Sequence, residues 1–459
     1  MKLLFDRGDL RVEKIDNIKN EINYYLNKEE NVKEEWIEEN HPIDIAEALS
    51  ELDASEINDF TKLLETEDLA DIFEESEKDL QIDILKCKSS EEIIEIFSHM
   101  AADDITDILG LLPIQKRKEL LRHMKQDDAL VVKNLLGYDR ESAGGIMTTE
   151  YLLLSKNLTT TEALNKIKKI APDTEIIDTI FVADSNKKLV GSVDLRDILS
   201  SDDEKKLEEL MDDNIIKVSA DVDQEIVAQQ VAKYDLTVIP VINKSGILIG
   251  IITVDDIIDV IEAENTEDLY KMHGVDEEES SDTTLLQSIK SRMPWMFINL
   301  ATAFLATFTV AMFEDVIAQV AALAAAMPIV AGMGGNAGTQ TLSIVIRGIA
   351  LGEIDFKDNW TLLFKEAMVG VINGAATGLV TGLILYLMYG NYYLGLIIFL
   401  AMILNLLVAG MFGFLIPLFL QSLGIDPALA SAIFLTTVTD VFGFFVFLGL
   451  ARGFIVYLI

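Results

Sequence analysis

The pattern of hydrophobic and polar positions divides the 459-residue chain into two parts of different character. Charged side chains are absent from residues 293–313, 316–346 and 367–425, and a helix needs about 20 apolar residues to cross a membrane. The first two stretches each have room for one span, and the third, interrupted by YGNYYLG at 389–395, has room for two. A fifth apolar stretch follows Pro427. The pattern predicts a transmembrane domain of five α-helices over 291–459.

Residues 1–137 have the pattern of short amphipathic helices. Similar segments at 41–49, 66–73, 90–97 and 102–109 begin with polar residues and continue with apolar positions at i, i+3 and i+4. Helix pairs of this kind bury their apolar faces by stacking on one another. We expect an N-terminal α-helical superhelical domain.

Residues 138–265 contain one βαββα pattern twice, first from GGIMTTEYLLLS to LVGSVDLRDIL and then from LEELMDDNIIKVS to LIGIITVDDIID. The repeat resembles a tandem pair of CBS domains of α+β fold. The resemblance implies a ligand-sensing regulator, and some such pairs bind an adenine nucleotide. The residues that carry it are Met147 and Met211 at the starts and Gly191, Asp194, Asp197, Gly250, Thr253 and Asp256 at the ends.

Residues 266–290, TEDLYKMHGVDEEESSDTTLLQSIK, join this pair to the first span. We expect a long connecting helix here that reaches the membrane.

The charge is distributed unevenly between the two parts. Residues 1–291 carry 32 Lys and Arg against 68 Asp and Glu, and the remainder carries 5 against 8. Net charges of −36 and −3 follow. A surface this acidic repels phosphates, which excludes a nucleic-acid partner, and it suits cations.

Several classes of function are excluded by what the sequence lacks. Cys87 is the only cysteine, so there is no intrachain disulfide and a reducing compartment fits. The four histidines lack metal-ligand spacing, and no nucleophile–base set or phosphate loop supports an enzyme. The opening MKLLFDRGDL lacks the apolar core of a signal peptide, so we expect the N-terminal domains in the cytosol.

Lys and Arg predict the orientation, because they concentrate on the cytosolic side of a membrane. Lys290 and Arg292 precede the first span, and Arg347, Lys357 and Lys365 follow the second. Five spans then leave the C-terminus outside a multi-pass protein of the plasma membrane, surrounded by membrane lipid.

Asp440 lies in the middle of the last span, FLTTVTDVFGFFVFLGLA. A carboxylate there costs about 2.5 kcal/mol or more, and no basic residue lies within any span. Either Asp440 is protonated and hydrogen-bonded, or it lines an aqueous path and meets a cation. The second interpretation is favoured because intramembrane acids mark ion pathways. Neighbouring candidates for the lining are Thr436, Thr437 and Gly443.

The second span carries polar residues in a glycine-rich stretch, PIVAGMGGNAGTQTL at 328–342. Polar groups at this depth are tolerated only against protein or a water-filled cavity. Either a pore or a polar helix contact explains Asn336, Thr339 and Gln340.

The order of these parts resembles the MgtE family of magnesium transporters and channels over essentially the whole chain. GMGGNAGTQ, GIDPALAS and TTVTDVFGFFVFLGLA are the most specific motifs. The resemblance implies a homodimer of five-span subunits with the pore on the two-fold axis, and it implies that Asp440 binds the permeating ion.

The resemblance also implies that acidic residues of the soluble domains sense intracellular Mg²⁺. Facing acidic surfaces repel, so Mg²⁺ between them draws the domains together and closes the pore. The matching positions are Asp71, Asp103, Asp107, Glu225, Asp235, Asp256, Asp259, Glu264, Glu267 and Asp268.

A magnesium importer closed by intracellular Mg²⁺ is therefore the favoured function. The alternatives are a carrier for Co²⁺ or Mn²⁺, a carrier coupled to Na⁺, and a membrane-anchored CBS sensor that does not conduct. Flux with competing ions separates them.

Overall fold

The computed structural model describes residues 2–28, 30–170, 174, 176–275, 279, 283–354, 360–429 and 431–459, with side chains from Lys14 onward. The chain forms two compact units, Met1–Ile258 and Asp259–Ile459. The first holds the helical region and the repeated region, and the second holds the long apolar helices.

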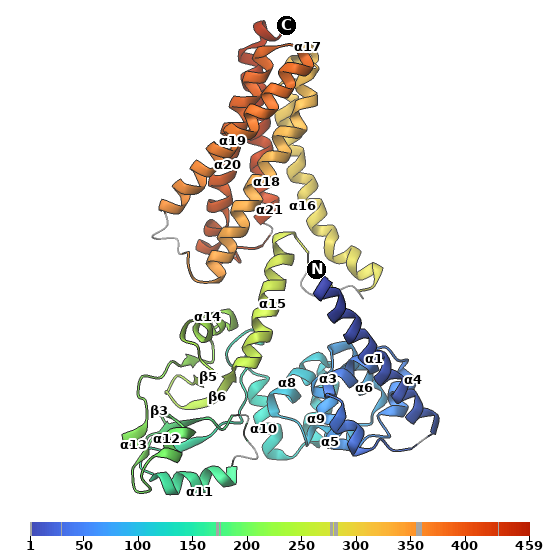
Figure 1. Ribbon diagram of the computed structural model, residues 1–459, viewed down its shortest axis with the longest axis vertical. Coiled ribbons are helices and arrows are strands. Elements are labelled where there is room, and N and C mark those ends of the chain that lie inside the picture. The colour runs from blue at the N-terminus through green and yellow to red at the C-terminus, as the bar shows by residue number, and fades with distance from the viewer. Residues whose placement is uncertain are drawn as a thin grey trace. The chain divides into compact units, whose positions relative to one another are not determined.

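Short helices fill the N-terminal region, as the amphipathic pattern predicts (Figure 1). Their apolar faces form one core around Phe60 and Phe73, both fully buried. The helices are α1 (Lys2–Lys28), α2 (Glu34–Glu39), α3 (Pro42–Ser50), α4 (Ala54–Phe60), α5 (Thr66–Glu74), α6 (Lys78–Cys87), α7 (Ser90–Phe97), α8 (Ala102–Leu111), α9 (Ile114–His123) and α10 (Gln126–Leu135).

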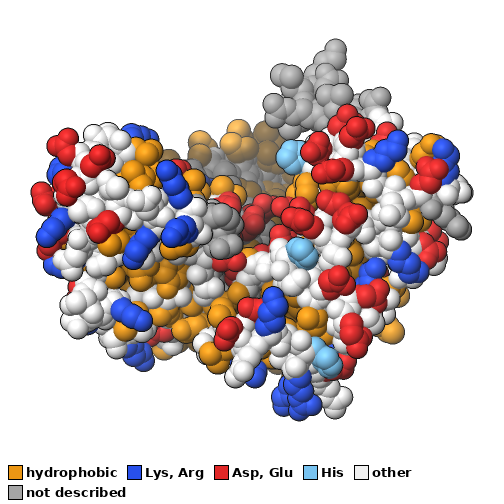
Figure 2. All heavy atoms as spheres, turned by 90° about the horizontal axis from the view of Figure 1, so that it is seen from below, with side chains coloured by type: hydrophobic (Ala, Val, Ile, Leu, Met, Phe, Trp, Pro, Cys, Tyr) orange, Lys and Arg blue, Asp and Glu red, His pale blue; other side chains and the backbone are white. Residues whose placement is uncertain are grey.

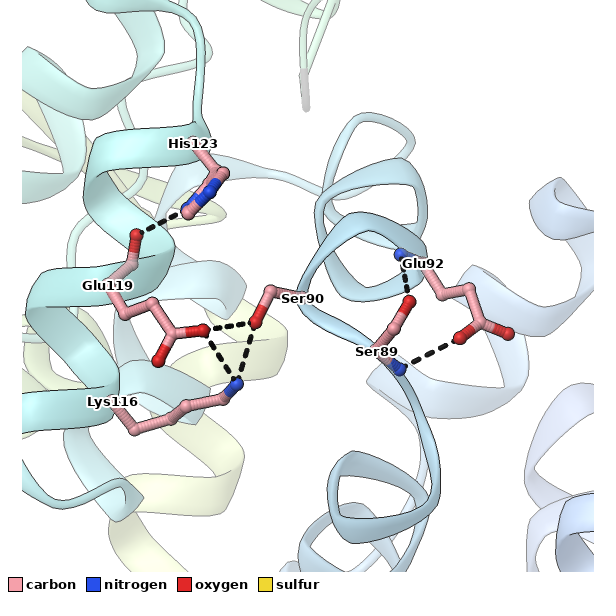
Figure 3. Close-up of polar contacts among 6 residues, drawn as sticks. All are labelled: Ser89, Ser90, Glu92, Lys116, Glu119 and His123. Carbon is pink, nitrogen blue, oxygen red and sulfur yellow. Dashed lines mark hydrogen bonds and ion pairs between the residues drawn. The ribbon is translucent and has the colours of Figure 1, made fainter.

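Helix α7 shows how local sequence fixes an element and its neighbour (Figure 3). Ser89 and Glu92 form a reciprocal capping box: the Ser89 N–H donates to Oε2 of Glu92 at 2.8 Å, and the Glu92 N–H donates to the Ser89 hydroxyl at 3.3 Å. Nζ of Lys116 on α9 donates to the Ser90 hydroxyl at 2.7 Å and lies 3.2 Å from Oε1 of Glu119. The cap defines where α7 begins, and the lysine ties that end to α9.

The repeated region folds as the βαββα pattern predicts, into two three-stranded sheets. In each sheet the first strand is parallel to the second, and the second is antiparallel to the third. The elements are β1 (Leu153–Ser155), α11 (Thr160–Ile170), β2 (Thr179–Ala183), β3 (Leu189–Asp194), α12 (Leu195–Ser200), α13 (Leu207–Leu210), β4 (Val218–Ser219), α14 (Gln224–Tyr234), β5 (Val238–Ile242), β6 (Leu248–Thr253) and α15 (Val254–Met272).

The residues that open each repeat pack on the sheet of the other repeat. A Cβ at Gly250 would lie 2.5 Å from the sulfur of Met147, and one at Gly191 would lie 2.7 Å from the sulfur of Met211. Thr148, next to Met147, also forms an antiparallel β-bridge with Ile251, next to Gly250. The methionine at the start of each repeat therefore contacts the motif glycine of the other repeat, and this contact occurs twice.

The connecting helix differs from the prediction for 266–290. Helix α15 begins at Val254, inside the second repeat, and ends at Met272, and the next helix starts at Leu285. Gly274 adopts φ +68°, a left-handed conformation that favours glycine, and the Val275 N–H returns to the Tyr270 carbonyl at 3.0 Å. This glycine cap ends the helix, so a helix continuous with the first span does not form.

The second unit contains five long helices gathered into a bundle (Figure 1). Among the described residues α16, α19, α20 and α21 are long and apolar enough to span a membrane. Helix α18 has 29 residues but carries the polar glycine-rich stretch, so a fifth span remains a prediction. The elements are α16 (Leu285–Ala311), α17 (Glu314–Gln319), α18 (Ala322–Ala350), α19 (Trp360–Tyr389), α20 (Tyr392–Ser422), α21 (Ser431–Gly453) and α22 (Ile455–Leu458).

Glycines on α19 let its backbone touch that of α20. A Cβ at Gly370 would lie 2.2 Å from the Leu406 carbonyl oxygen, and one at Gly382 would lie 2.6 Å from the Gly395 carbonyl oxygen. The glycine repeat of this span therefore packs against a helix, as small residues do in membranes.

Candidate cation pathway and regulatory sites

Asp440 lies half-buried in the middle of α21, and three threonines precede it within about one turn of the helix. Each hydroxyl donates to a carbonyl one turn earlier: Thr436 to Ala432 at 3.0 Å, Thr437 to Ile433 at 2.7 Å. A hydroxyl that has given its hydrogen to the helix keeps oxygen lone pairs for other partners. The sequence Thr-Thr-Val-Thr-Asp therefore presents acceptor oxygens, which suit a cation and its water.

Helix α18 packs on α21 through its glycines. A Cβ at Gly338 would lie 2.9 Å from Leu435, and one at Gly335 would lie 3.7 Å from the methyl group of Thr436. The polar residues Asn336 and Gln340 lie one turn apart on α18, and both are exposed in the single chain. Amides at that depth need protein or water beside them, so this face of α18 is suited to a subunit contact or an aqueous path.

The two remaining predicted lining residues, Thr339 and Gly443, differ from each other. The Thr339 hydroxyl donates to the Gly335 carbonyl at 2.9 Å, so its oxygen keeps acceptor lone pairs, as those of Thr436 and Thr437 do. Gly443 is buried, and a Cβ there would lie 2.8 Å from Nδ2 of Asn405. Gly443 thus takes part in helix packing and does not line open space.

The C-terminal end of α15 and the turn before α21 bring four acids of the second unit together. Burial first, and then the carboxylates of Asp426 and Glu264, raise the pKa of Asp268 to about 6. Lys271 pairs with Glu267 and lies 3.0 Å from Oδ2 of Asp426. These contacts join the connecting helix to the turn before α21, the helix that carries Asp440.

An apolar contact supports the same junction. Met272, the last residue of α15, packs with Leu342 and Ile346 of α18 and with Leu435 of α21. Asp426 escaped the sequence analysis, although GIDPALAS was noted as a motif. The only indication of it in the sequence was the position of an acidic residue directly before the last span.

A second acidic cluster forms in the first unit, around α8 and the start of α15. Burial and then the carboxylates of Asp103, Glu74, Asp107 and Asp256 raise the pKa of Asp104 to about 8. Burial and then Asp71 raise the pKa of Glu74 to about 7. Acidic side chains gather in the middle of the face drawn in Figure 2. The structure thus groups four predicted acids and adds Asp104 and Glu74, which sequence reasoning missed.

Other predicted acids lie elsewhere. Asp235 is exposed and caps α14 in a left-handed conformation at φ 51°, and the Glu225 N–H donates to Asp223 at 2.9 Å near the start of the same helix. Asp259 is exposed on α15. Within the described part of the chain, no group of three or more His, Cys, Asp or Glu residues is close enough to hold a metal ion. A cation bound by one chain would therefore keep several waters, as Mg²⁺ often does.

Comparison with known proteins places these features in a family. A family model described as a divalent cation transporter matches residues 327–450, one for the MgtE intracellular N domain matches 40–141, and the CBS domain model matches 143–204 and 207–263. The magnesium transporter MgtE of Bacillus subtilis is 35% identical over 324 residues, which cover 71% of this chain and 72% of that protein. The chain belongs to the MgtE family. This is a family of transporters and not of enzymes, as the sequence analysis predicts.

A second relative and two solved structures are also similar to this chain. The magnesium transporter MgtE of Thermus thermophilus is 35% identical over 329 residues, covering 70% of this chain and 72% of that protein. The crystal structure of the soluble part of a magnesium transporter is 30% identical, with a TM-score of 0.50, and covers 55% of this chain and 99% of that chain. A crystal structure of the cytosolic domain of the Mg²⁺ channel MgtE in complex with ATP is 32% identical at a TM-score of 0.48, covering 49% and 92%.

Proposed function

We propose that the chain is a magnesium channel or transporter of the plasma membrane that imports Mg²⁺ as a homodimer and is closed by intracellular Mg²⁺. The observation that carries the transport part is Asp440, a half-buried acid among acceptor oxygens in the middle of an apolar helix. Two copies of this carboxylate at a two-fold axis supply a charge of about −2, which matches the ion. The MgtE relatives are named magnesium transporters.

The regulatory part is supported by the two acidic clusters. Burial first, and then the neighbouring carboxylates, raise the pKa values of Asp104 and Asp268, so like charges lie close together at both places. Mg²⁺ would relieve the repulsion at both places, and the second place adjoins the turn before the helix of Asp440. The family model that matches residues 40–141 is described as an intracellular domain, which supports a cytosolic sensor.

Weak sites suffice for this control. One site at tenfold its dissociation constant contributes about 1.4 kcal/mol, and the equilibrium of a two-state gate moves from 1:99 to 99:1 with about 5.5 kcal/mol. Roughly four sites reach that value, so closure should be cooperative. An adenine nucleotide bound at the CBS pair would provide a further regulatory signal to the gate.

Flux measurements test the transport proposal. Purified protein in liposomes should take up Mg²⁺, and Asp440→Ala should abolish the uptake while Asp315→Ala, an acid outside the long helices, should not. No uptake by the unsubstituted protein would leave a non-conducting sensor as the better account. Competition by Co²⁺, Mn²⁺ and Na⁺ then decides between a magnesium pathway and the other carriers.

Limited proteolysis tests the gating proposal. Cleavage within 266–290 should decline as Mg²⁺ rises through the millimolar range, because the connecting segment is then held by bound cations. A digestion pattern that does not respond to Mg²⁺ would contradict control through this segment.

A further inference from the structure

Asn405 is a fully buried amide in the membrane unit to which the proposed mechanism gives no role. It lies on α20, and its Nδ2 donates to the Val330 carbonyl on α18 at 2.9 Å. Its Oδ1 is buried and has no hydrogen-bond partner among the described residues. An unpaired buried acceptor costs about 1–3 kcal/mol, and an apolar side chain of the same shape avoids that cost. Bundle stability alone therefore does not explain this asparagine.

The amide is held between α18 and α21 at two glycines. A Cβ at Gly334 of α18 would lie 2.4 Å from Nδ2 of Asn405. A Cβ at Gly443 of α21 would lie 2.8 Å from Nδ2 and 3.0 Å from Oδ1. Both helices meet the amide without a side chain between them. One side chain of α20 thus sets how closely these two helices approach.

Both contacts adjoin the residues of the proposed pathway. Gly443 lies three residues after Asp440, and positions i and i+3 are neighbours on a helix surface. Gly334 lies two residues before Asn336, and a Cβ there would also lie 3.2 Å from Thr439, the residue before Asp440. A shift of the amide would therefore move the turn of α21 that carries Asp440.

We propose that Asn405 is a positioning residue for transport, whose amide fixes the spacing of α18 and α21 and so the place of Asp440. The inference rests on the proposed role of Asp440 in passing Mg²⁺. Mg²⁺ demands near-ideal octahedral geometry and tolerates little displacement of its oxygen ligands. A side chain of similar size without the amide keeps the bundle folded but loses the fixed spacing.

The test uses the full chain in liposomes and compares Asn405→Leu with the unsubstituted protein. We expect an unchanged or higher unfolding temperature in detergent, Mg²⁺ uptake reduced about tenfold or more, as for ångström-scale misplacement of a reacting group, and a changed ratio of Mg²⁺ to Mn²⁺ uptake. A merely structural residue would lower stability and leave that ratio unchanged. Gly443→Ala, which pushes the amide away, should give the same uptake defect, and the double variant should lose no more.

Gly453→Ala is the matched control, because a Cβ at this position, at the end of α21, meets nothing within 4 Å. It should leave uptake and the ion ratio unchanged. If the unsubstituted protein transports Mg²⁺ and both Asn405→Leu and Gly443→Ala transport it at the same rate and ratio, the positioning role is overturned and the proposed function stands. If Asn405→Leu does not fold, Gly443→Ala alone decides. Absence of uptake in the unsubstituted protein overturns the proposed function instead.

Discussion

The acidic cluster around Asp104 should make the first unit less stable as pH rises when no Mg²⁺ is present. The pKa of Asp104 rises from 3.8 to about 8 in the folded chain. The folded state then holds a proton that the unfolded chain has already released, so stability falls as pH increases between about 4 and 8. Mg²⁺ binds the ionised carboxylates and should restore the stability.

The magnitude follows from the shift and the exposure of the group. About 4 pKa units correspond to roughly 5 kcal/mol at about 1.36 kcal/mol per unit. Asp104 is only partly buried, so solvent screening reduces this to on the order of 1–2 kcal/mol. For a unit of this size that is a fall of about 2–8 °C in the unfolding temperature.

Trp36 provides a reporter for this unit. It is buried, its Nε1 donates to Glu21 at 2.6 Å, and its ring meets the edge of Phe60. In a chain with the other two tryptophans, Trp295 and Trp360, replaced by phenylalanine, fluorescence reports unfolding of the first unit alone.

The measurement compares unfolding temperatures from pH 5 to pH 8.5 in EDTA and in excess Mg²⁺. Stabilisation by Mg²⁺ should be larger at pH 8 than at pH 5, and Asp104→Asn should flatten the pH dependence in EDTA. Asp235→Asn, at an exposed acid that caps α14, serves as the control and should leave the slope in place. Equal Mg²⁺ stabilisation at both pH values, or an undiminished slope in Asp104→Asn, would refute the reasoning.

Three further outcomes follow from particular contacts. Asp426→Asn should raise the Mg²⁺ concentration that half-protects the connecting segment from protease by about tenfold, the effect of losing about 1.4 kcal/mol at one site; an unchanged midpoint would remove Asp426 from the site. Gly274→Ala should destabilise the end of α15 by about 1 kcal/mol because its φ is positive, which hydrogen exchange of that segment measures. Gly370→Ala should lower the unfolding temperature of the second unit, because its Cβ would lie 2.2 Å from the Leu406 carbonyl oxygen; Gly453→Ala, with open space around it, should not.

Periodicity and composition predicted the elements of both units, because short helices, the βαββα repeat and long apolar helices each leave a local pattern. The segment 66–73 became α5 and the break at 389–395 became the turn between α19 and α20. The prediction of a connecting helix over 266–290 was wrong, and the reason is also local. A left-handed glycine at 274 ended it, and the sequence HG could have indicated that stop.

The composition of the candidate sites was determined by sequence, but their grouping was not. Asp440 could be identified from the sequence because a carboxylate within an apolar stretch has a large free-energy cost in the membrane. Asp426 beside Asp268, Glu74 beside Asp104, and Asn405 between Gly334 and Gly443 are 30 or more residues apart in the chain. Such contacts depend on how helices pack, and helix packing depends on the shapes of whole faces and not on any one stretch of sequence. Only the tertiary structure could therefore decide which acids share a cluster and which buried amide meets the helix of Asp440.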